Sequence, residues 1–260
     1  MYNFNSSTSK TKSTIKAFIE GIGESELDCE IQDGKYIYQG DIVITDYDDN
    51  ITKGLIIPYI SSRWKSNTVP YVITNGMNNN EIIRAMNHIE SKSNIQFVKR
   101  TSQRNYIEFV KANGCWSYVG MQGGKQQIGL SPLCGYGATV HEICHALGIW
   151  HEQSRSDRDN YVTINWSNIQ QDAKHNFNKH ISDGTNIGKY DYSSIMHYSK
   201  YAFAINSSKP TIIPKYSSYI GQRNGLSNGD IYAIKRMYGY SRSNDEYPSS
   251  SIIQESDSLE

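Results

Sequence analysis

The feature that most constrains this chain is a run of three histidines within residues 141–151. The run reads HEICHALGIWH and spaces His141, His145 and His151 in the pattern HExxHxxGxxH. On an α-helix, residues four apart lie ~6 Å apart along the axis and about 40° apart around it, so the first two histidines share a face. Gly148 can adopt positive φ, which would end the helix and turn the chain back. We therefore expect all three imidazoles to converge.

Three nitrogen ligands with one open position are typical of a catalytic zinc ion rather than a structural one. Glu142 is rotated by about 100° from His141, which places it beside the metal instead of on it. There it can act as general base for water whose pKa zinc has lowered to about 7. The alternative is three ordinary core or surface histidines. However, an unpaired polar triplet is costly in a core, and the surrounding helix is too apolar for a surface. We predict one catalytic Zn²⁺.

Composition limits the partners. Lys plus Arg number 26 and Asp plus Glu number 26, so no net field favours nucleic acid or an anionic membrane. Hydrophobic residues make up 37% and charged residues 20%, which is typical of a soluble globular protein. No apolar run approaches the ~18–20 residues that would span a bilayer. We expect no nucleic-acid partner, no membrane span and a monomer.

Periodicity divides the chain into a leading segment (residues 1–55), a catalytic domain (56–240) and a disordered polar, acidic tail (241–260). Helical spacing of apolar residues predicts two helices that flank a third, buried helix carrying the histidines. The expected helices cover residues 78–93, 138–152 and 226–239. Alternating or β-rich runs predict strands at residues 36–45, 69–74, 94–100, 105–110, 115–120 and 125–130.

Two further stretches resemble a known family. SIMHY, at 194–198, matches a methionine turn downstream of the third histidine, and HEQSRSDRDNYVTINW begins at that histidine. Together with SKYAFAINSSKPTIIP and IGQR, they are similar to the astacin family of the metzincin clan over about residues 58–240. The resemblance implies a zinc endopeptidase acting on proteins or peptides. It also implies an α+β fold, in which a lobe with a twisted, mostly parallel sheet and the zinc helix covers an irregular C-terminal lobe.

The resemblance also implies roles for single residues. Glu142 is the catalytic base, and Met196 forms an apolar floor beneath the metal. Tyr198 offers its phenol as an extra zinc ligand that swings out to stabilise the oxyanion. Glu152 binds the ammonium group of the freshly cut N-terminus. From the residues alone, Tyr198 would be read as a packing tyrosine, and the alternative for Glu152 is an exposed carboxylate at a helix end.

Substrate contacts are expected at two places. An extended peptide would pair with the exposed edge strand at 115–120, which makes Trp116 and Tyr118 candidate substrate-binding residues. Lys215 stands where relatives such as the meprins carry a basic residue facing the primed side of the cleft. A cation there would favour Asp or Glu just after the scissile bond. The alternative is a solvated loop lysine.

Two rival functions are a binding protein without catalysis and a hydrolase for another amide. The intact residues of the histidine motif argue against the first. No stretch resembles the carbohydrate- or lipid-binding additions that would suggest the second.

The four cysteines require separate arguments. Cys115 and Cys134 match a pair that is disulfide-linked in the family, and we expect the bond in an oxidising compartment. The family's second disulfide is missing at both ends. Cys144 precedes a zinc ligand by one residue and, at helical spacing, points away from the metal as a buried apolar group.

The leading segment suggests a zymogen activated by its removal. Tyr38-Gln39-Gly40-Asp41 resembles the FxGD motif of astacin pro-segments, in which the Asp carboxylate takes the water's place on zinc. Asp41 is therefore the expected switch, and cleavage between about Asp46 and Pro58 would remove it. Cys29 is the alternative, because a thiolate binds zinc more strongly; its acidic neighbours, however, disfavour the thiolate.

Localisation leaves two possibilities. The N-terminus lacks the apolar region of a signal peptide, and the Ser/Glu-rich tail loosely resembles bacterial effectors exported by a type IV system, as in Legionella. Secretion, with the signal removed, is the default for the family and ranks first. The alternative is a type IV-translocated effector that acts in a host cell.

Overall fold

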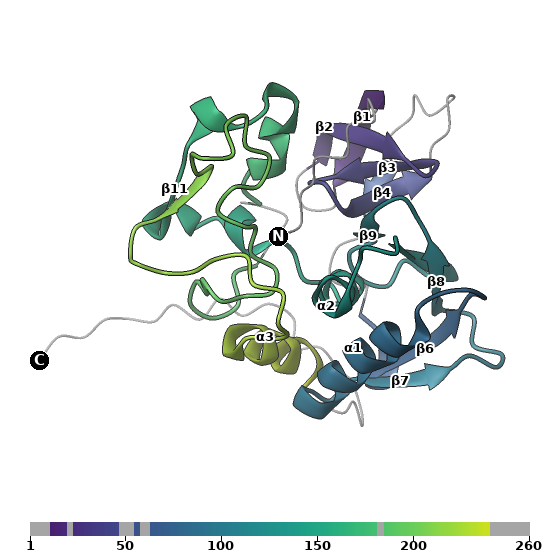
Figure 1. Cartoon of the computed structure of the whole chain (residues 1–260). Helices are drawn as coiled ribbons and strands as arrows, with labels where there is room; N and C mark the ends of the chain where they lie inside the picture. The colour runs from purple at the N-terminus through teal and green to yellow at the C-terminus, as the bar shows by residue number, and fades with distance from the viewer. Residues whose placement is uncertain (1–10, 20–22, 47–54, 58–62, 181–184, 240–260) are drawn as a thin grey trace, which may run out of the picture.

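The structure, a computed structural model, describes residues 11–19, 23–46, 55–57, 63–180 and 185–239. The expected tail at 241–260 lies outside these residues. Two lobes face each other across the helix that carries the histidines (Figure 1). One contains the large sheet and the other is irregular, which agrees with the predicted α+β architecture.

The sheet of the catalytic domain is mostly parallel, as predicted. Its parallel strands are β7 (Gln96–Lys99), β6 (Thr68–Ile73), β8 (Tyr106–Lys111) and β10 (Lys125–Leu130). The short β9 (Cys115–Ser117) runs antiparallel to β10 and is the last strand of this part. A disulfide between Cys115 and Cys134 joins β9 to the loop before the next helix, which is the expected pairing.

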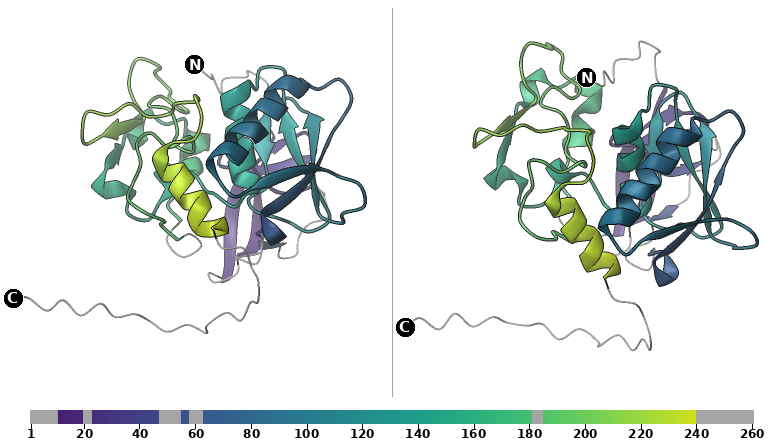
Figure 2. Two further views of the ribbon diagram at one scale, coloured as in Figure 1. Left: turned by 90° about the horizontal axis from the view of Figure 1, so that it is seen from below. Right: turned by 60° about the horizontal axis from the view of Figure 1, so that its bottom comes forward.

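The described residues form three α-helices, and the first two pack against strands of this sheet. They are α1 (Asn79–Lys92), α2 (Tyr136–Ala146) and α3 (Asn228–Tyr238). The apolar stripe of α1 is buried at Ile82 and Ile89, and α1 lies alongside α2 in the sheet lobe (Figure 2). The predicted cap at Ser227 forms a full capping box with Asp230 at the start of α3. The Asn run before α1 supplies no side-chain cap.

The leading segment continues the same sheet. Its strands are β1 (Thr11–Ile19), β2 (Gly23–Gln32), β3 (Lys35–Tyr38) and β4 (Ile42–Asp46), while β5 (Leu55–Ile57) crosses the expected boundary at residue 55 and pairs with β1. The sheet order is β5-β1-β2-β3-β4-β9-β10-β8-β6-β7, and a single residue pair, Ile42 with Ser117, joins β4 to β9. The single strand predicted over 36–45 is therefore wrong. Gln39 and Gly40 have φ of 51° and 82°, and this turn divides the stretch into two antiparallel strands.

The C-terminal lobe consists mainly of turns. Short 3₁₀ helices occur at η2 (Glu152–Ser154), η3 (Arg158–Asn160), η4 (Trp166–Asn168) and η5 (Gln171–Phe177), and another, η1 (Lys65–Asn67), precedes β6. The strands β11 (Val162–Ile164) and β12 (Ile212–Pro214) form a separate pair. Phe177, Tyr198 and Ile212 belong to the buried core of this lobe.

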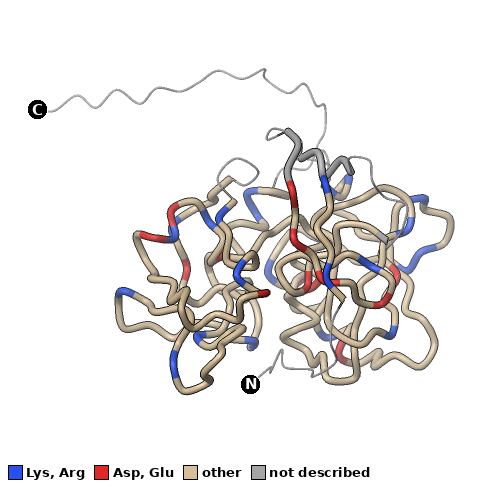
Figure 3. The backbone as a smooth tube through the Cα atoms, turned by 90° about the horizontal axis from the view of Figure 1, so that it is seen from above, with Lys and Arg blue, Asp and Glu red and all other residues tan. Residues whose placement is uncertain are grey.

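Both signs of charge are distributed over both lobes (Figure 3), as the balanced composition suggested. Within the described parts of the chain, no helix has the length and apolarity needed to cross a membrane.

Candidate active site

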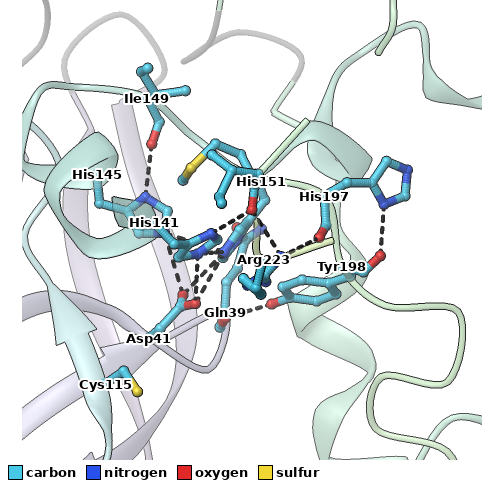
Figure 4. Close-up of polar contacts among 12 residues, drawn as sticks. Gln39, Asp41, Cys115, His141, His145, Ile149, His151, His197, Tyr198 and Arg223 are labelled. Carbon is cyan, nitrogen blue, oxygen red and sulfur yellow. Dashed lines mark hydrogen bonds and ion pairs between the residues drawn. The ribbon is translucent and has the colours of Figure 1, made fainter. Parts of the chain in front are cut away.

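The three histidines of the motif converge on one point. His141 and His145 lie on α2, which ends at Ala146, and Gly148 with φ of 102° turns the chain so that His151 returns to them. The Nε2 atom of His151 lies 3.3 Å from that of His141 and 3.3 Å from that of His145 (Figure 4). All three side chains are buried.

The Nδ1 atoms of His141 and His145, which point away from the other histidines, lie next to backbone carbonyl oxygens. His141 Nδ1 lies 2.8 Å from the carbonyl oxygen of Ile195, and His145 Nδ1 lies 2.8 Å from that of Ile149. Because a carbonyl only accepts, each Nδ1 must carry the hydrogen, which leaves each Nε2 with a lone pair. Lone pairs gathered this closely repel unless a cation lies between them. These residues therefore fit a zinc ion.

Asp41 of the leading segment completes a set of four ligand atoms. Its Oδ2 lies 3.2 Å from the Nε2 atoms of His141 and His151, and its Oδ1 lies 3.6 Å from His145 Nε2. The four atoms lie within 4.8 Å of one another, and Asp41 Oδ1 has no hydrogen-bond partner although it is buried. Burial raises the pKa of Asp41, but the histidines beside it hold the pKa well below its usual range. One oxygen and three nitrogens suit tetrahedral zinc.

Glu142 lies outside this set of four, as its position on the helix predicted. Its side chain is buried, and Oε2 has no hydrogen-bond partner. Burial, reinforced by the negative charge of Asp41, raises the pKa of Glu142 well above its usual value, while Arg223 opposes the shift. A buried carboxyl with an unpaired oxygen, next along the helix to a zinc ligand, is suited to accept and pass on a proton.

The methionine turn lies beneath the histidines. Met196 is fully buried in the core that contains α2, which agrees with a structural role. The centres of the Tyr198 and His151 rings lie 4.6 Å apart. The Tyr198 hydroxyl, however, donates a hydrogen bond to the carbonyl oxygen of Gln39 at 2.5 Å. Tyr198 is thus adjacent to the metal site with its hydroxyl held by the leading segment.

The two free cysteines lie outside the set of ligand atoms. Cys29 is buried between β1 and β3 in the apolar core of the leading strands. Burial, with the charges of Asp28 and Glu30, raises the pKa of Cys29 to about 12, so it stays a thiol. Cys144 is packed in the main core, as expected from its helical position.

Glu152 and Lys215 occupy the C-terminal lobe. Glu152 accepts a hydrogen bond from the backbone of Asp191 at 2.7 Å, and burial raises its pKa to about 7. The alternative of an exposed carboxylate is therefore wrong. Lys215 follows β12, and its ammonium group donates a hydrogen bond to the carbonyl oxygen of Asp159 at 2.5 Å.

The expected substrate-binding residues touch the leading segment. Trp116 Nε1 donates to Asp33 Oδ2 at 3.1 Å, and the Lys35 ammonium lies 5.2 Å from the centre of the Trp116 ring and 5.7 Å from that of Tyr118. The backbone N–H of Ser117 donates to the carbonyl oxygen of Asp41 at 2.9 Å. The leading segment therefore occupies the edge of β9.

Three residues of this region were missed by sequence reasoning: Asp33, Gln39 and Arg223. Gln39 lies within YQGD and Arg223 within IGQR, so both belonged to stretches already noted for their resemblance. The signal for Asp33 is the Asp-Gly dipeptide of a tight hairpin turn.

Comparison with known proteins gives a match to the family model for the Astacin peptidase family over residues 57–239. Human meprin A subunit beta is 48% identical over 139 residues, which cover 50% of this chain and 20% of that protein. The astacin-like metalloendopeptidase of mouse is 48% identical over 136 residues, or 50% of this chain and 31% of that protein. The match thus spans less than a third of these relatives.

Among solved structures, high choriolytic enzyme 1 of medaka, described as a hatching enzyme zinc-protease, aligns with a TM-score of 0.65 and 40% identity. The alignment covers 70% of this chain and 97% of that one.

Proposed function

The chain belongs to the Astacin family of peptidases, and on this basis we propose that it is a zinc endopeptidase kept latent by its own leading segment. Its catalytic domain is of the astacin zinc metalloendopeptidase type, which uses one catalytic zinc ion. The observation that carries the proposal of latency is the Asp41 carboxylate at 3.2 Å from two of the three histidine Nε2 atoms. The proposed substrates are proteins or peptides.

The proposed chemistry divides between the metal and the side chains around it. When bound, zinc acts as a Lewis acid toward water and the scissile carbonyl. Glu142 takes the proton of the attacking water on its free Oε2 and passes it to the leaving nitrogen. Tyr198, once released from Gln39, donates its hydroxyl to the oxyanion. His141, His145 and His151 hold the metal.

Gln39 and Gly40 support latency beside Asp41. The carbonyl oxygen of Gln39 accepts from Tyr198, and its side-chain amide donates to Ser154 Oγ at 3.1 Å. The Oε1 atom of Gln39 lies 3.2 Å from His151 Nδ1. A Cβ on Gly40 would lie 2.9 Å from the Phe203 ring, so only glycine fits this positive-φ turn without displacing the ring. The turn thus brings Asp41 to the metal and removes the Tyr198 hydroxyl from catalysis.

A second contact supports latency away from the metal. The Asp33 carboxylate accepts from the backbone N–H of Asn113 at 3.0 Å and from its side-chain amide at 2.5 Å, in addition to Trp116. Lys35 covers the rings of Trp116 and Tyr118. A substrate strand would need the same edge, so the segment must leave before a peptide can pair with β9.

Substitutions in the uncut full-length chain test this proposal. Asp41→Ala should hydrolyse casein or a fluorogenic peptide without prior proteolysis, while Cys29→Ser should stay latent until the segment is cut. A chelator should abolish activity in every case. The opposite pattern would transfer the switch to Cys29, and full activity of the uncut wild type would rule out latency altogether.

For maturation, we propose cleavage between about Asp46 and Pro58, a window that includes residues 47–54 outside the described parts. We also propose secretion, with a type IV-translocated bacterial effector as the alternative. The relatives quoted above come from animals, so the alternative rests on the terminal sequences alone. Deleting residues 241–260 should leave proteolysis intact, and only an effector would lose delivery into host cells.

A further inference from the structure

We infer that Arg223 is a positioning residue for the metal site, because it fixes the carbonyl group that orients His141. Arg223 lies in the loop before α3 and approaches the methionine turn at 194–198 (Figure 4). The inference depends on the zinc site but not on latency, since Arg223 acts on a histidine of the catalytic domain.

The carbonyl oxygen of Ile195 receives two donors. His141 Nδ1 donates to it at 2.8 Å, and Arg223 Nη1 donates to it at 2.9 Å. A carbonyl oxygen has two lone pairs, so both hydrogen bonds can form together. The direction of this carbonyl sets the tilt of the His141 ring, and therefore where its Nε2 lone pair points.

The peptide groups around Ile195 are held by two charged side chains, Asp230 and Arg223. Asp230 accepts from the Ile195 N–H at 2.8 Å and from Ser194 Oγ at 2.6 Å. Arg223 Nη1 also lies 3.2 Å from the carbonyl oxygen of His197, beyond the methionine. Without Arg223, the carboxylate of Asp230 would still hold the N–H side of the turn. The carbonyl oxygen of Ile195, which orients His141, would lose its second donor.

The backbone of Arg223 is also fixed against the zinc helix. A Cβ on Gly137, in the first turn of α2, would lie 1.8 Å from the carbonyl oxygen of Arg223, so helix and loop are in direct contact. Arg223 Nη1 further donates to the carbonyl oxygen of Gln222 at 2.8 Å. Arg223 thus connects α2, which carries His141, to the turn that orients it.

Arg223→Met tests the inference, because it keeps most of the side-chain length but removes the charge and all donors. Zinc affinity of the full-length chain is measured by competition with a chromophoric chelator, and stability of the zinc-free chain by urea unfolding. We expect zinc to bind about 10- to 100-fold more weakly, the range found when partners of metal-ligating histidines are removed.

Gln222→Ala is the matched control in the same loop. The Gln222 amide donates to the carbonyl oxygens of Ser193 and Gly225 but not to that of Ile195, so its loss should leave zinc affinity unchanged. Unchanged affinity in Arg223→Met, or an equal loss in both variants, would overturn the positioning role.

If Arg223→Met does not fold, the zinc affinity and the cobalt(II) spectrum of Arg223→Lys test the inference instead. Lysine keeps the charge but lacks the planar guanidinium group whose Nη1 reaches the carbonyl oxygens of Ile195 and His197. With the inference correct, this variant binds zinc more weakly than wild type, and its cobalt(II)-substituted form has an altered visible spectrum because the ligand geometry has changed. Wild-type affinity together with a wild-type cobalt spectrum would refute it.

Discussion

Replacing Asp33 by alanine should make the uncut chain measurably active, because it weakens the contact of the leading segment with β9 and with the residues just before it. Three hydrogen bonds are lost, two to Asn113 and one to Trp116. Hydrogen bonds to charged groups contribute about 1.5–3 kcal/mol each when buried, but the Asn113 pair is exposed and counts for far less. We take a total of about 2 kcal/mol, which corresponds to about a 30-fold shift toward the undocked state.

The assay is the basal rate of peptide hydrolysis by the uncut chain with zinc present, divided by the rate after activation. Asp33→Ala should raise this ratio about 30-fold, the factor that follows from 1.4 kcal/mol per tenfold change. Asp28→Ala is the control, because Asp28 accepts from Thr14 within the leading strands at 2.8 Å, and the same charge is removed. The reasoning would be refuted if Asp33→Ala had the same ratio of basal to activated rate as the wild type while Asp41→Ala made the uncut chain active.

Three more outcomes follow from the site. Glu142→Gln should keep zinc, since Glu142 is no ligand, but lose about 10³-fold in turnover with the base; near-normal turnover would contradict this role. Lys215→Glu should erase or reverse any preference for Asp or Glu after the scissile bond, as read from peptide-library cleavage, and a wild type without that preference would exclude the role. Cys134→Ser should lower the free energy of unfolding by about 3 kcal/mol, because the disulfide closes a 19-residue separation.

Predictions from the sequence succeeded where the structure depends on residues that are close together in the chain. The spacing of His141 and His145 on a helix, and the positive φ of Gly148, depend on a few neighbouring residues, so the convergence of the imidazoles could be predicted. The Cys115–Cys134 pairing also matched. For the histidines the resemblance to a family added roles to a pattern that already had a chemical meaning, whereas the disulfide was predicted from the resemblance alone.

The missed residues depend on contacts between distant parts of the chain. Asp33 meets Asn113, and Arg223 meets Ile195, only after the sheet and the methionine turn have formed. The strands β1 and β2 of the leading segment were missed for a different reason. Leu27 and Cys29 alternate with charged residues along β2, but one strand face is polar, so the segment looked merely hydrophilic.

The continuous ten-stranded sheet has a consequence for the handling of the protein. A strand at the edge of a sheet offers unpaired N–H and C=O groups to any other chain, which invites association edge to edge. In the intact chain β4 lies against β9, so this edge meets its own leading segment instead of a neighbouring molecule. The proposed removal of the leading segment would expose the edge of β9, and substrate, solvent or a second copy would then compete for its unpaired N–H and C=O groups.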